Sequence, residues 1–452
     1  MKKYFVILTI LAAALTSCVD TSATAEDKNA NITSFNVISA TSTSLEYSVA
    51  FTINHDADGN GYGEIHNTDS LSYTTKLDSL RPIILGSALS SIVIMSGKDT
   101  VAYQYDGSTV TSLPVIDFSD SIPVKIVTTA KDKKTTKTYS INVRGHKNDP
   151  NLYVWKGLTS QLQVYPDNAV GEKLLFFNDK LNLYINTGSA VKLYTSDNGS
   201  VWTENTLVGF PNSADIKYIV ELSSKLYVFD NNSVYISSDG ANWDQHGSSN
   251  TVDNMLFVLN EKIYGINNNE LKLYELDTTS FVWSQKTTLS STFPVSGAGI
   301  CVDTSVTAGN QRAFVVGGED LNGNLLNSVW STENGSYWAN LAITGNWFSV
   351  RSGVAVFQYD NHLMMIGGKD ASGVLTDDFQ LYSPDFGLSW KALLENMRIN
   401  SLYVNRYNAQ VALDKDKVKI YLVGGQTSSS TFVKDCWLGM KNELAWTIQP
   451  SN

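Results

Sequence analysis

The sequence predicts an all-β protein with two domains of unequal size. Before residue 150, runs of Val, Ile, Thr and Tyr alternate with clusters of Gly, Asp, Asn and Ser, and no convincing helical period is present. All ten Trp lie beyond residue 150, so the chain changes character near Pro150. The 452 residues also exceed what one hydrophobic core usually supports. We therefore expect a domain boundary near Pro150.

The composition excludes two classes of function. The chain carries 33 Lys and Arg against 44 Asp and Glu, a net charge of −11, and it has no basic run that could grip a phosphate backbone. Nucleic-acid binding is therefore not expected. Five His and three Cys, without CxxC or HxxxH spacing, are too few soft ligands for an ordinary zinc or copper site. We predict no metal and no cofactor.

The N-terminus has the pattern of an export signal. Lys2 and Lys3 precede an apolar stretch that ends at Leu15, and small residues follow before Cys18. Residues 1–17 are therefore predicted to be a signal peptide, too short to span a membrane. Residues 18–31 are polar and are expected to form a flexible tether.

Leu15-Thr16-Ser17-Cys18 resembles the lipobox of bacterial lipoproteins. The resemblance implies cleavage before Cys18 and acylation of that residue, which would anchor the protein to a membrane. The alternative is an ordinary secretory signal with an incidental Cys. The lipobox favours a lipid anchor in the outer membrane of the cell envelope, on its periplasmic or its cell-surface side.

Residues 32–148 are predicted to form a β-sandwich. The segments 45–53, 83–95 and 122–129 are rich in β-branched residues. Residues 136–143 (TKTYSINV) resemble the last strand of the immunoglobulin-like or cadherin-like sandwiches that bacterial surface lipoproteins carry as spacers. The length of this region also suits one sandwich.

The loop from Asn54 to Glu64 contains half of a calcium-binding pattern. Asp56, Asp58 and Asn60, followed by Gly61, match D-x-[DN]-x-[DN]-G. The bidentate Glu that would complete the cage is missing. A hairpin loop rich in Gly, Asp and Asn explains the same residues and is favoured over a calcium site.

Residues 151–452 contain six repeats of roughly fifty residues. Each repeat has a Trp that follows an apolar strand and a turn, and these are Trp202, Trp243, Trp283, Trp338, Trp390 and Trp446. Each also has an earlier strand centred on a mostly apolar triplet, at 183–185, 226–228, 263–265, 313–315, 363–365 and 420–422. The phase of the repeat is thus the same in all six units.

Two signatures within the repeats resemble known families. Gly317-Gly318, Gly367-Gly368 and Gly424-Gly425 end strands in three units, as in kelch repeats. Residues 383–390 (SPDFGLSW) match the Asp-box S-x-D-x-G-x-x-W, and weaker matches begin at Thr195, with Asp197 in the Asp position, and at Ser331, with Glu333 there. A fourth match, from Ser237 to Trp243, is one residue short. Both families are β-propellers, so the resemblance implies an immunoglobulin-like β-sandwich followed by a six-bladed β-propeller over 151–452. Either the segment around Trp155 or the one around Trp446 could complete the last blade.

Enzymes with these signatures require residues that the repeats largely lack. Sialidases need an arginine trio, a Tyr-Glu pair and an acid Asp, whereas residues 151–452 hold four Arg and lack that family's opening strand. A copper oxidase of the kelch type needs two His and a Tyr-Cys crosslink, whereas the repeats hold only His246 and His362, and Cys301 and Cys436 fall in different units. A non-catalytic role is favoured, and the alternative is a carbohydrate-active, sialidase-like hydrolase whose acid pair the sequence does not identify.

Four residues are candidates for ligand binding. Arg351 and Arg406 begin the innermost strands of successive repeats, where binding propellers of the kelch kind line the mouth of the channel. Trp347 and Tyr403 precede them and could offer flat rings to a sugar or peptide. Pairing of the arginines with blade carboxylates and packing of the rings between blades are the structural alternatives.

The whole chain resembles a family of lipoproteins of Gram-negative, gut-type bacteria that carry a sandwich-like domain before a six-unit propeller. This resemblance implies a membrane-anchored recognition or scaffold protein that presents its propeller to a glycan or protein ligand.

Overall fold

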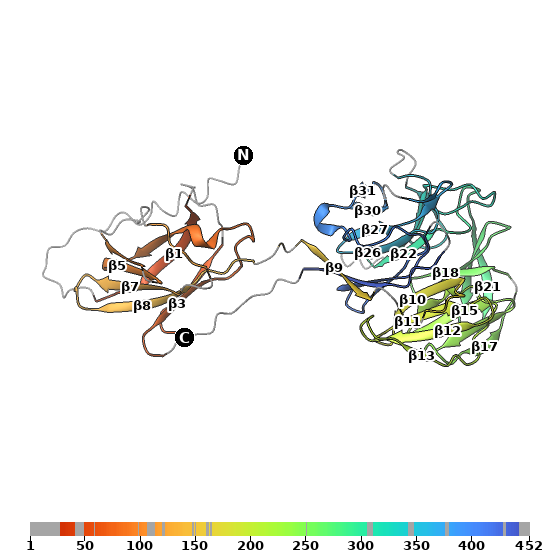
Figure 1. Ribbon diagram of the computed structural model, residues 1–452, viewed down its shortest axis with the longest axis horizontal. Coiled ribbons are helices and arrows are strands. Elements are labelled where there is room, and N and C mark those ends of the chain that lie inside the picture. Colours follow the sequence, from red (N-terminus) through yellow and green to blue (C-terminus); the bar gives the residue numbers. More distant parts are fainter. Residues whose placement is uncertain are drawn as a thin grey trace. The chain divides into compact units, whose positions relative to one another are not determined.

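The computed structural model describes residues 28–40, 49–57, 59–97, 99–105, 114–119, 123–146, 149, 151–159, 162, 165–249, 251–304, 311–341, 348–375, 379–427 and 431–442. The chain divides into two compact units, one ending at Pro150 and the other comprising Asn151–Asn442 (Figure 1). The predicted signal peptide and Cys18 lie outside the described residues. Within the described part, no helix has the length and hydropathy to cross a membrane.

The N-terminal unit consists of two sheets around one core. The strands are β1 (Ile32–Ser39), β2 (Phe51–Asn54), β3 (Gly63–Asn67), β4 (Leu80–Gly86), β5 (Leu89–Ser96), β6 (Asp99–Gln104), β7 (Val124–Ala130) and β8 (Thr136–Asn142). β1 pairs with β4, and the larger sheet has the order β2-β3-β8-β7-β5-β6. β3 and β8 run parallel, while the other pairs are antiparallel. Alternate residues of both sheets enter one hydrophobic cluster, as a sandwich requires.

Two details of this unit were not resolved by the sequence. The segment 83–95 is not one strand, because the chain turns at Ser87 and Ala88 between β4 and β5. The loop after Asn54 joins β2 to β3 as a hairpin in which Asp56 accepts the N–H of Gly61 at 2.7 Å. The hairpin interpretation is thus confirmed for the backbone, while Asp58 lies outside the described residues.

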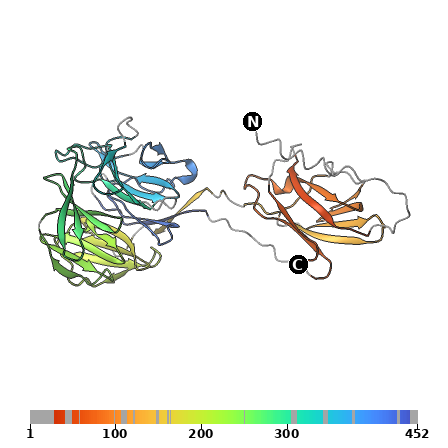
Figure 2. The same cartoon turned by 180° about the vertical axis from the view of Figure 1, so that it is seen from behind.

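The second unit is a ring of six antiparallel sheets of four strands each, seen from opposite sides in Figures 1 and 2. The innermost strands are β10 (Gly171–Phe177), β14 (Val220–Leu222), β18 (Asn254–Leu259), β22 (Gly299–Thr304), β26 (Ala355–Tyr359) and β32 (Gln410–Leu413). The second strands are β11 (Lys180–Asn186), β15 (Lys225–Asp230), β19 (Lys262–Asn267), β23 (Gln311–Val316), β27 (His362–Ile366) and β33 (Lys419–Val423). The third strands are β12 (Val191–Ser196), β16 (Ser233–Ser237), β20 (Lys272–Asp277), β24 (Val329–Thr332), β30 (Gln380–Ser383) and β34 (Cys436–Lys441). The outermost strands are β13 (Thr203–Asn205), β17 (Asp244–Gly247), β21 (Val282–Thr288), β25 (Ala339–Asn340), β31 (Lys391–Ala392) and β9 (Tyr153–Thr159).

A few short elements interrupt this pattern. β28 (Lys369–Asp370) and β29 (Gly373–Val374) form a small hairpin in the fifth blade. The described helical segments are single 3-10 turns, η2 (Leu77–Ser79), η3 (Ile216–Tyr218) and η4 (Glu395–Met397). The predicted all-β class, a sandwich followed by a six-bladed propeller, is confirmed.

The repeated triplets form the buried second strand of every blade, as their phase predicts. Residues of neighbouring blades share each of six hydrophobic clusters, so every blade buries its faces against the blades on both sides. One cluster joins Leu183 of the first blade to Tyr421 of the sixth, so the ring is closed. A single blade could not bury both faces, and ring closure supplies the missing surface.

The ring closes through the N-terminal strand. β9 pairs antiparallel with β34 and supplies the outermost strand of the sixth blade, and Figure 1 shows β9 beside the blue strands of the C-terminal part. Trp155 stands opposite Gly439, where an added Cβ would meet the Trp155 ring at 2.4 Å. Of the two closures left open by the sequence, the one through Trp155 is correct, and Trp446 lies outside the described residues.

In the turns between the third and the outermost strands, the residue that takes the Asp position of the motif differs from the predicted one. In the first and fourth blades, Asn198 and Asn334 accept the two N–H groups that the turn requires, and Ser196 and Thr332 each accept the N–H of the following Gly at 2.9 Å. Placing Asp197 and Glu333 in the Asp position was wrong by one residue, because these carboxylates pair with Lys180 and Arg312. The turn from Ser237 to Trp243 has the same seven-residue form and is not a shortened one.

The turn of the fifth blade is the exception in length. It carries one extra residue, Phe386, at φ 55°. Ser383 still accepts the N–H of Gly387 at 2.7 Å, and Asp385 accepts the N–H of Ser389 at 2.8 Å. Residues 383–390, which match the eight-residue Asp-box in full, therefore form a turn that is one residue longer than the other three.

Candidate ligand site on the propeller axis

Arg406 lies inside the sixth blade and not at the channel mouth. It is 1% exposed, and its guanidinium forms two bonds to Asp435, Nη1 to Oδ1 at 2.5 Å and Nη2 to Oδ2 at 2.9 Å. Nη1 also donates to the carbonyl of Gly424, and the cation lies 4.1 Å from the ring centre of Tyr403. Tyr403 itself is buried and packs edge-on against Trp437. Arg406 therefore pairs with a carboxylate of its own blade, which was the structural alternative to ligand binding.

Arg351 occupies the equivalent place in the fifth blade. It is fully buried, and its Nε donates to the carbonyl of Ser349 at 3.0 Å. Phe348 packs under the cation at 5.4 Å, as Tyr403 does for Arg406, so Phe348 and not Trp347 is the counterpart of Tyr403. Trp347 lies outside the described residues.

Arg351, Arg406 and Tyr403 are thus parts of the blade interior. A ligand at the surface would not reach these side chains without a rearrangement of the blades. Arg351 and Arg406 lie four residues before the innermost strands β26 and β32 and do not begin them. Each guanidinium packs over an aromatic ring inside the protein. The candidate site has to be sought elsewhere.

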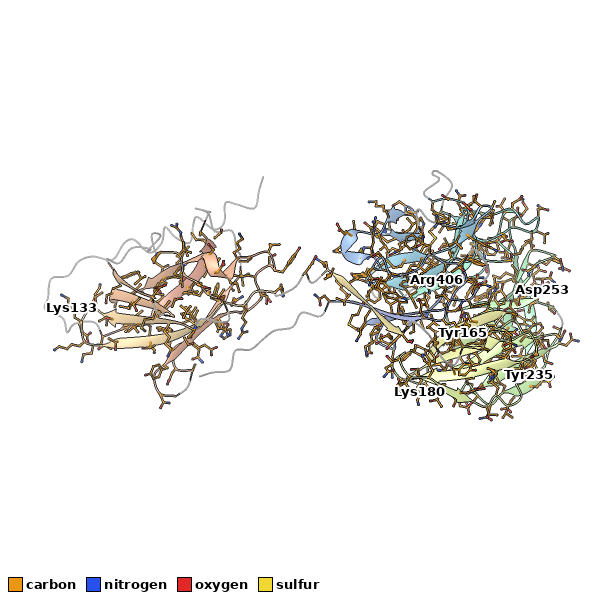
Figure 3. All side chains as sticks on the ribbon, viewed as in Figure 1. Lys133, Tyr165, Lys180, Tyr235, Asp253 and Arg406 are labelled. Carbon is orange, nitrogen blue, oxygen red and sulfur yellow. The ribbon has the colours of Figure 1, made fainter. Side chains whose placement is uncertain are left out.

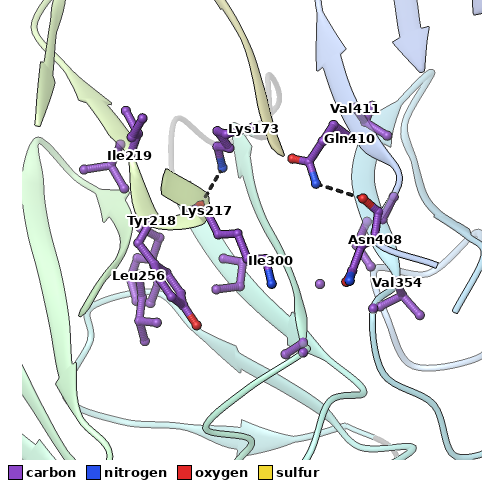
Figure 4. Close-up of a pocket in the computed structure, with 18 of the residues that line it drawn as sticks. Lys173, Lys217, Tyr218, Ile219, Leu256, Ile300, Val354, Asn408, Gln410 and Val411 are labelled. Atoms are coloured by element: carbon purple, nitrogen blue, oxygen red, sulfur yellow. Dashed lines mark hydrogen bonds between the residues drawn. The ribbon is translucent and has the colours of Figure 1, made fainter. Parts of the chain in front are cut away.

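A cavity of about 540 Å³ lies on the axis of the propeller. Its wall includes residues from the innermost strands of all six blades and from the loops before them (Figure 4). Leu256, Ile300, Val354 and Val411 supply an apolar part of this wall. A cavity of this size with a few polar groups on an apolar wall is typical of small-ligand sites.

The first and second blades supply the charged part of the wall. Lys173 on β10 donates from Nζ to the carbonyl of Lys217 at 2.9 Å. Lys217 is exposed in η3, and Asp215 accepts the N–H of Lys217 at 3.1 Å and thereby caps that turn. Burial lowers the pKa of Lys173 to about 8, against the opposing effect of Asp215. Its amine is therefore partly uncharged near pH 8.

Tyr218 and Glu221 complete this part of the wall. Burial, with Asp215 as a second cause, raises the pKa of Tyr218 to about 12, so its hydroxyl stays a hydrogen-bond donor at all physiological pH values. Burial also raises the pKa of Glu221 above its ordinary value. The wall thus carries two basic and two acidic side chains, with no large excess of either charge.

The opposite part of the wall is built from backbone. Gly297, Gly353 and Asn408 hold equivalent positions in the fourth, fifth and sixth blades, with φ of 63°, 71° and 57°. The N–H of Gly353 donates to the carbonyl of Gly297, and the N–H of Asn408 donates to the carbonyl of Gly353, each at 2.7 Å. These bonds link three blades around the axis. An added Cβ at Gly353 would meet Oδ1 of Asn408 at 2.8 Å, so a side chain at this position would have to displace the Asn408 amide.

Asn408 brings a side chain to a position that is glycine in the two preceding blades. Its amide lies across the cavity from the ammonium group of Lys217, and both extend into the space between them (Figure 4). Its Nδ2 donates to Gln426 at 3.3 Å, and Gln410 donates to its carbonyl at 3.0 Å. A ligand between Lys217 and Asn408 would meet donors from both sides.

A buried polar network lies behind the charged wall. Glu172 precedes Lys173 on β10 and points to the other side of the strand, where it accepts the N–H of Gly425 and the hydroxyl of Tyr165. It is 2% exposed, and burial raises its pKa to about 8. The network joins the first blade to the sixth, next to Arg406, and so holds Lys173 at the cavity wall.

Sequence reasoning missed every polar residue of this cavity. Lys173, Lys217, Tyr218 and Glu221 lie in strands and a turn of the first two blades, and no motif links them. One signal was available in the sequence. Gly353 and Asn408, which line the cavity, each stand two residues after one of the arginines that the sequence singled out. Among the described residues, no group of three or more His, Cys, Asp or Glu is placed to hold a metal ion.

Comparison with known proteins identifies the family. The profile of the DUF6242 beta propeller domain matches residues 149–449, about two thirds of the chain. The chain belongs to this family. The profile of the DUF6242 N-terminal domain, a domain of unknown function, matches residues 19–143. No curated protein matches the chain.

Among solved structures, one described as "Structure of YjhT" matches the DUF6242 chain at 16% identity and a TM-score of 0.43. The match covers 62% of this chain and 96% of that one.

Proposed function

We propose that this DUF6242 protein is a lipid-anchored, non-catalytic recognition protein of the cell envelope, whose propeller binds a glycan in the axial cavity. The observation that carries the proposal is the cavity itself, in which Lys217 and Asn408 face one another across a space of about 540 Å³.

The chemistry of the wall supports a polyhydroxylated ligand. Sugar hydroxyls both donate and accept hydrogen bonds, and the wall offers the amines of Lys173 and Lys217, the hydroxyl of Tyr218 and the amide of Asn408. Two lysines against Asp215 and Glu221 leave the formal charge of the wall near zero, which suits a neutral ligand better than a polyphosphate.

Recognition without turnover is supported by the structural role of one of the two acids in the wall, Asp215. Glycoside hydrolysis needs two carboxyl groups that flank one bond and are free to exchange protons. Asp215 is instead held by the N–H of Lys217 at the start of η3. We therefore favour binding over hydrolysis.

Anchoring of the chain is proposed from the sequence alone. Leu15-Thr16-Ser17-Cys18 has the form of a lipobox, which directs acylation of Cys18. Fractionation of cells that express the chain and its Cys18→Ser variant tests this part, because the unaltered chain should stay with the outer membrane and the variant should be released from it. Equal distribution of the two forms would contradict anchoring.

A glycan array with the purified full chain tests the binding part, together with a hydrolysis assay on the same sugars. Lys217→Met and Asn408→Gly should weaken binding about tenfold or more, since each removes one side of the cavity. Asn408→Gly keeps the backbone conformation because glycine stands at this position in the two preceding blades. Lys391→Met, on the exposed outermost strand of the fifth blade, is the control and should bind normally. Release of product would contradict a non-catalytic role.

A further inference from the structure

We propose that a hollow on the outer part of the fourth blade is a separate carbohydrate subsite, in which the ring of Tyr337 stacks on the face of a sugar and the Arg312–Glu333 pair bonds to its hydroxyls. This subsite does not depend on a ligand in the axial cavity.

The hollow surrounds the turn between β24 and β25. It has a volume of about 410 Å³, and its walls are formed by Arg312 on β23, by Glu333 and Tyr337 in the turn, and by the partly exposed Trp338. Aromatic rings beside planar charged groups are well suited to sugars, because the ring covers the C–H face while the charged groups bond to hydroxyls.

Tyr337 presents its ring to solvent from a rigid backbone. The side chain is 80% exposed, the largest exposed fraction among the large hydrophobic residues of the described chain. Its N–H donates to Oδ1 of Asn334 at 3.1 Å, within a turn that Thr332 also closes. The indole of Trp338 is fixed against Phe257 and Phe293. The ring of Tyr337 is therefore held outward without being buried by neighbours.

Arg312 and Glu333 form a fixed polar pair beside this ring. Nε and Nη2 of Arg312 both donate to Oε1 of Glu333, at 3.2 and 2.7 Å. Oε2 of Glu333 has no hydrogen-bond partner among the described residues. The pair is about half exposed, so it gives little stability and can bond to a ligand at low cost.

The first blade provides an internal comparison. The same turn there has Lys180 and Asp197 in place of Arg312 and Glu333, with their charged atoms 3.4 Å apart, and Val201 in place of Tyr337. The corresponding hollow has a volume of about 120 Å³. Lys180 lies at the outer edge of the propeller (Figure 3). The fourth blade thus differs from its counterpart in the three features that a sugar would use: an aromatic ring, a guanidinium and room.

The subsite and the axial cavity lie at opposite ends of the blades. Strand direction alternates across a blade of four antiparallel strands. The turn between the third and fourth strands therefore lies at one end of the blade, and the connection to the innermost strand of the following blade lies at the other end. Lys217 precedes the innermost strand β14, whereas Tyr337 follows the third strand β24. One short glycan therefore cannot contact both sites.

The test measures binding of the full chain to short α- and β-linked oligosaccharides of glucose, galactose, mannose and N-acetylglucosamine, first on an array and then by calorimetry. Tyr337→Ala should weaken binding about tenfold, and Tyr337→Phe should leave it within about twofold, since stacking uses the ring and not the hydroxyl. Val201→Ala, in the counterpart turn of the first blade, should have no effect. The aromatic NMR signals that Tyr337→Phe removes should shift when the sugar binds.

The outcomes separate this subsite from the axial cavity. Loss of binding in Tyr337→Ala with normal binding in Lys217→Met supports the subsite and contradicts the cavity as the glycan site. The reverse result, or an array on which no sugar binds in a manner that depends on Tyr337, overturns the subsite. Because Tyr337 is exposed, its variants should fold normally, and their thermal unfolding checks this.

Discussion

Arg406 and Asp435 form a bidentate ion pair inside the sixth blade, 29 residues apart in the chain. The indole of Trp437 also donates to Asp435 at 2.9 Å, and the ring of Tyr403 covers the guanidinium. Both charged groups are therefore satisfied without water. Such a pair gives little net stability over apolar residues, but the loss of one partner leaves a buried charge.

Replacing one partner of this pair should destabilise the propeller strongly. Asp435→Asn or Arg406→Met should lower the free energy of unfolding by about 3–5 kcal/mol, because the remaining charge stays buried without its counterion. Urea unfolding followed by tryptophan fluorescence measures this. The matched control is Glu204→Gln, whose partner Lys192 is 42% exposed, and it should cost less than about 1 kcal/mol. Equal effects of the two substitutions would contradict the role of burial.

Glu172 should make stability fall as pH rises. Its pKa is about 8 in the folded protein against an ordinary value of 4.5, because burial disfavours the carboxylate. Between these values the folded state holds a proton that the unfolded chain has released, so the free energy of unfolding decreases with rising pH and levels off above about 8. Urea unfolding at several pH values should show a flatter dependence for Glu172→Gln than for the unaltered chain. If the free energy of unfolding had the same slope against pH in both proteins, titration of Glu172 would not be its cause.

Lys173 should react with amine reagents at lower pH than ordinary lysines. Its pKa of about 8, against an ordinary lysine value of about 10.4, makes much of the amine uncharged at pH 8. Acylation followed by peptide mass spectrometry should show the labelling of Lys173 levelling off by about pH 9, while that of exposed lysines still rises. A sugar bound in the axial cavity should protect Lys173 and leave Lys391 unprotected.

Gly353→Ala should destabilise the wall of the axial cavity. The residue has φ 71°, and an added Cβ would meet Oδ1 of Asn408 at 2.8 Å. The conformation alone costs about 1–2 kcal/mol, and the close contact adds to that cost. Gly323→Ala is the control, because Gly323 has φ 77° with nothing within 4 Å of an added Cβ. The difference in their melting temperatures measures the close contacts of the added Cβ with Tyr407 and Asn408, and identical shifts would show that these contacts have no effect.

Gly439→Ala should loosen ring closure. An added Cβ would meet the Trp155 ring at 2.4 Å and push β9 away from β34. Hydrogen exchange of the β9 amides should accelerate. Gly157→Ala in the same strand pair adds only ordinary contacts at 3.7 Å or more and should exchange as the unaltered chain does. Protection of β9 that persists in Gly439→Ala would indicate that closure does not depend on this contact.

The sequence by itself determined the repeat. The six apolar triplets and the turns before Trp are local features, because alternation and turn chemistry are read within a few residues. They predicted six blades and the second strand of each. The register of the turns at Asn198 and Asn334 could not be predicted, because an acid stands one residue before each amide and fits the motif equally well.

The tertiary structure alone decided the closure and the site. Whether Trp155 or Trp446 completes the last blade depends on pairing between ends of the propeller that are far apart in the chain. Whether Arg406 faces a ligand or Asp435 depends on the direction of one side chain, which spacing does not encode. The cavity between Lys217 and Asn408 exists because closing a ring brings together groups that share no segment of sequence, and only the closed ring sets their distance and burial.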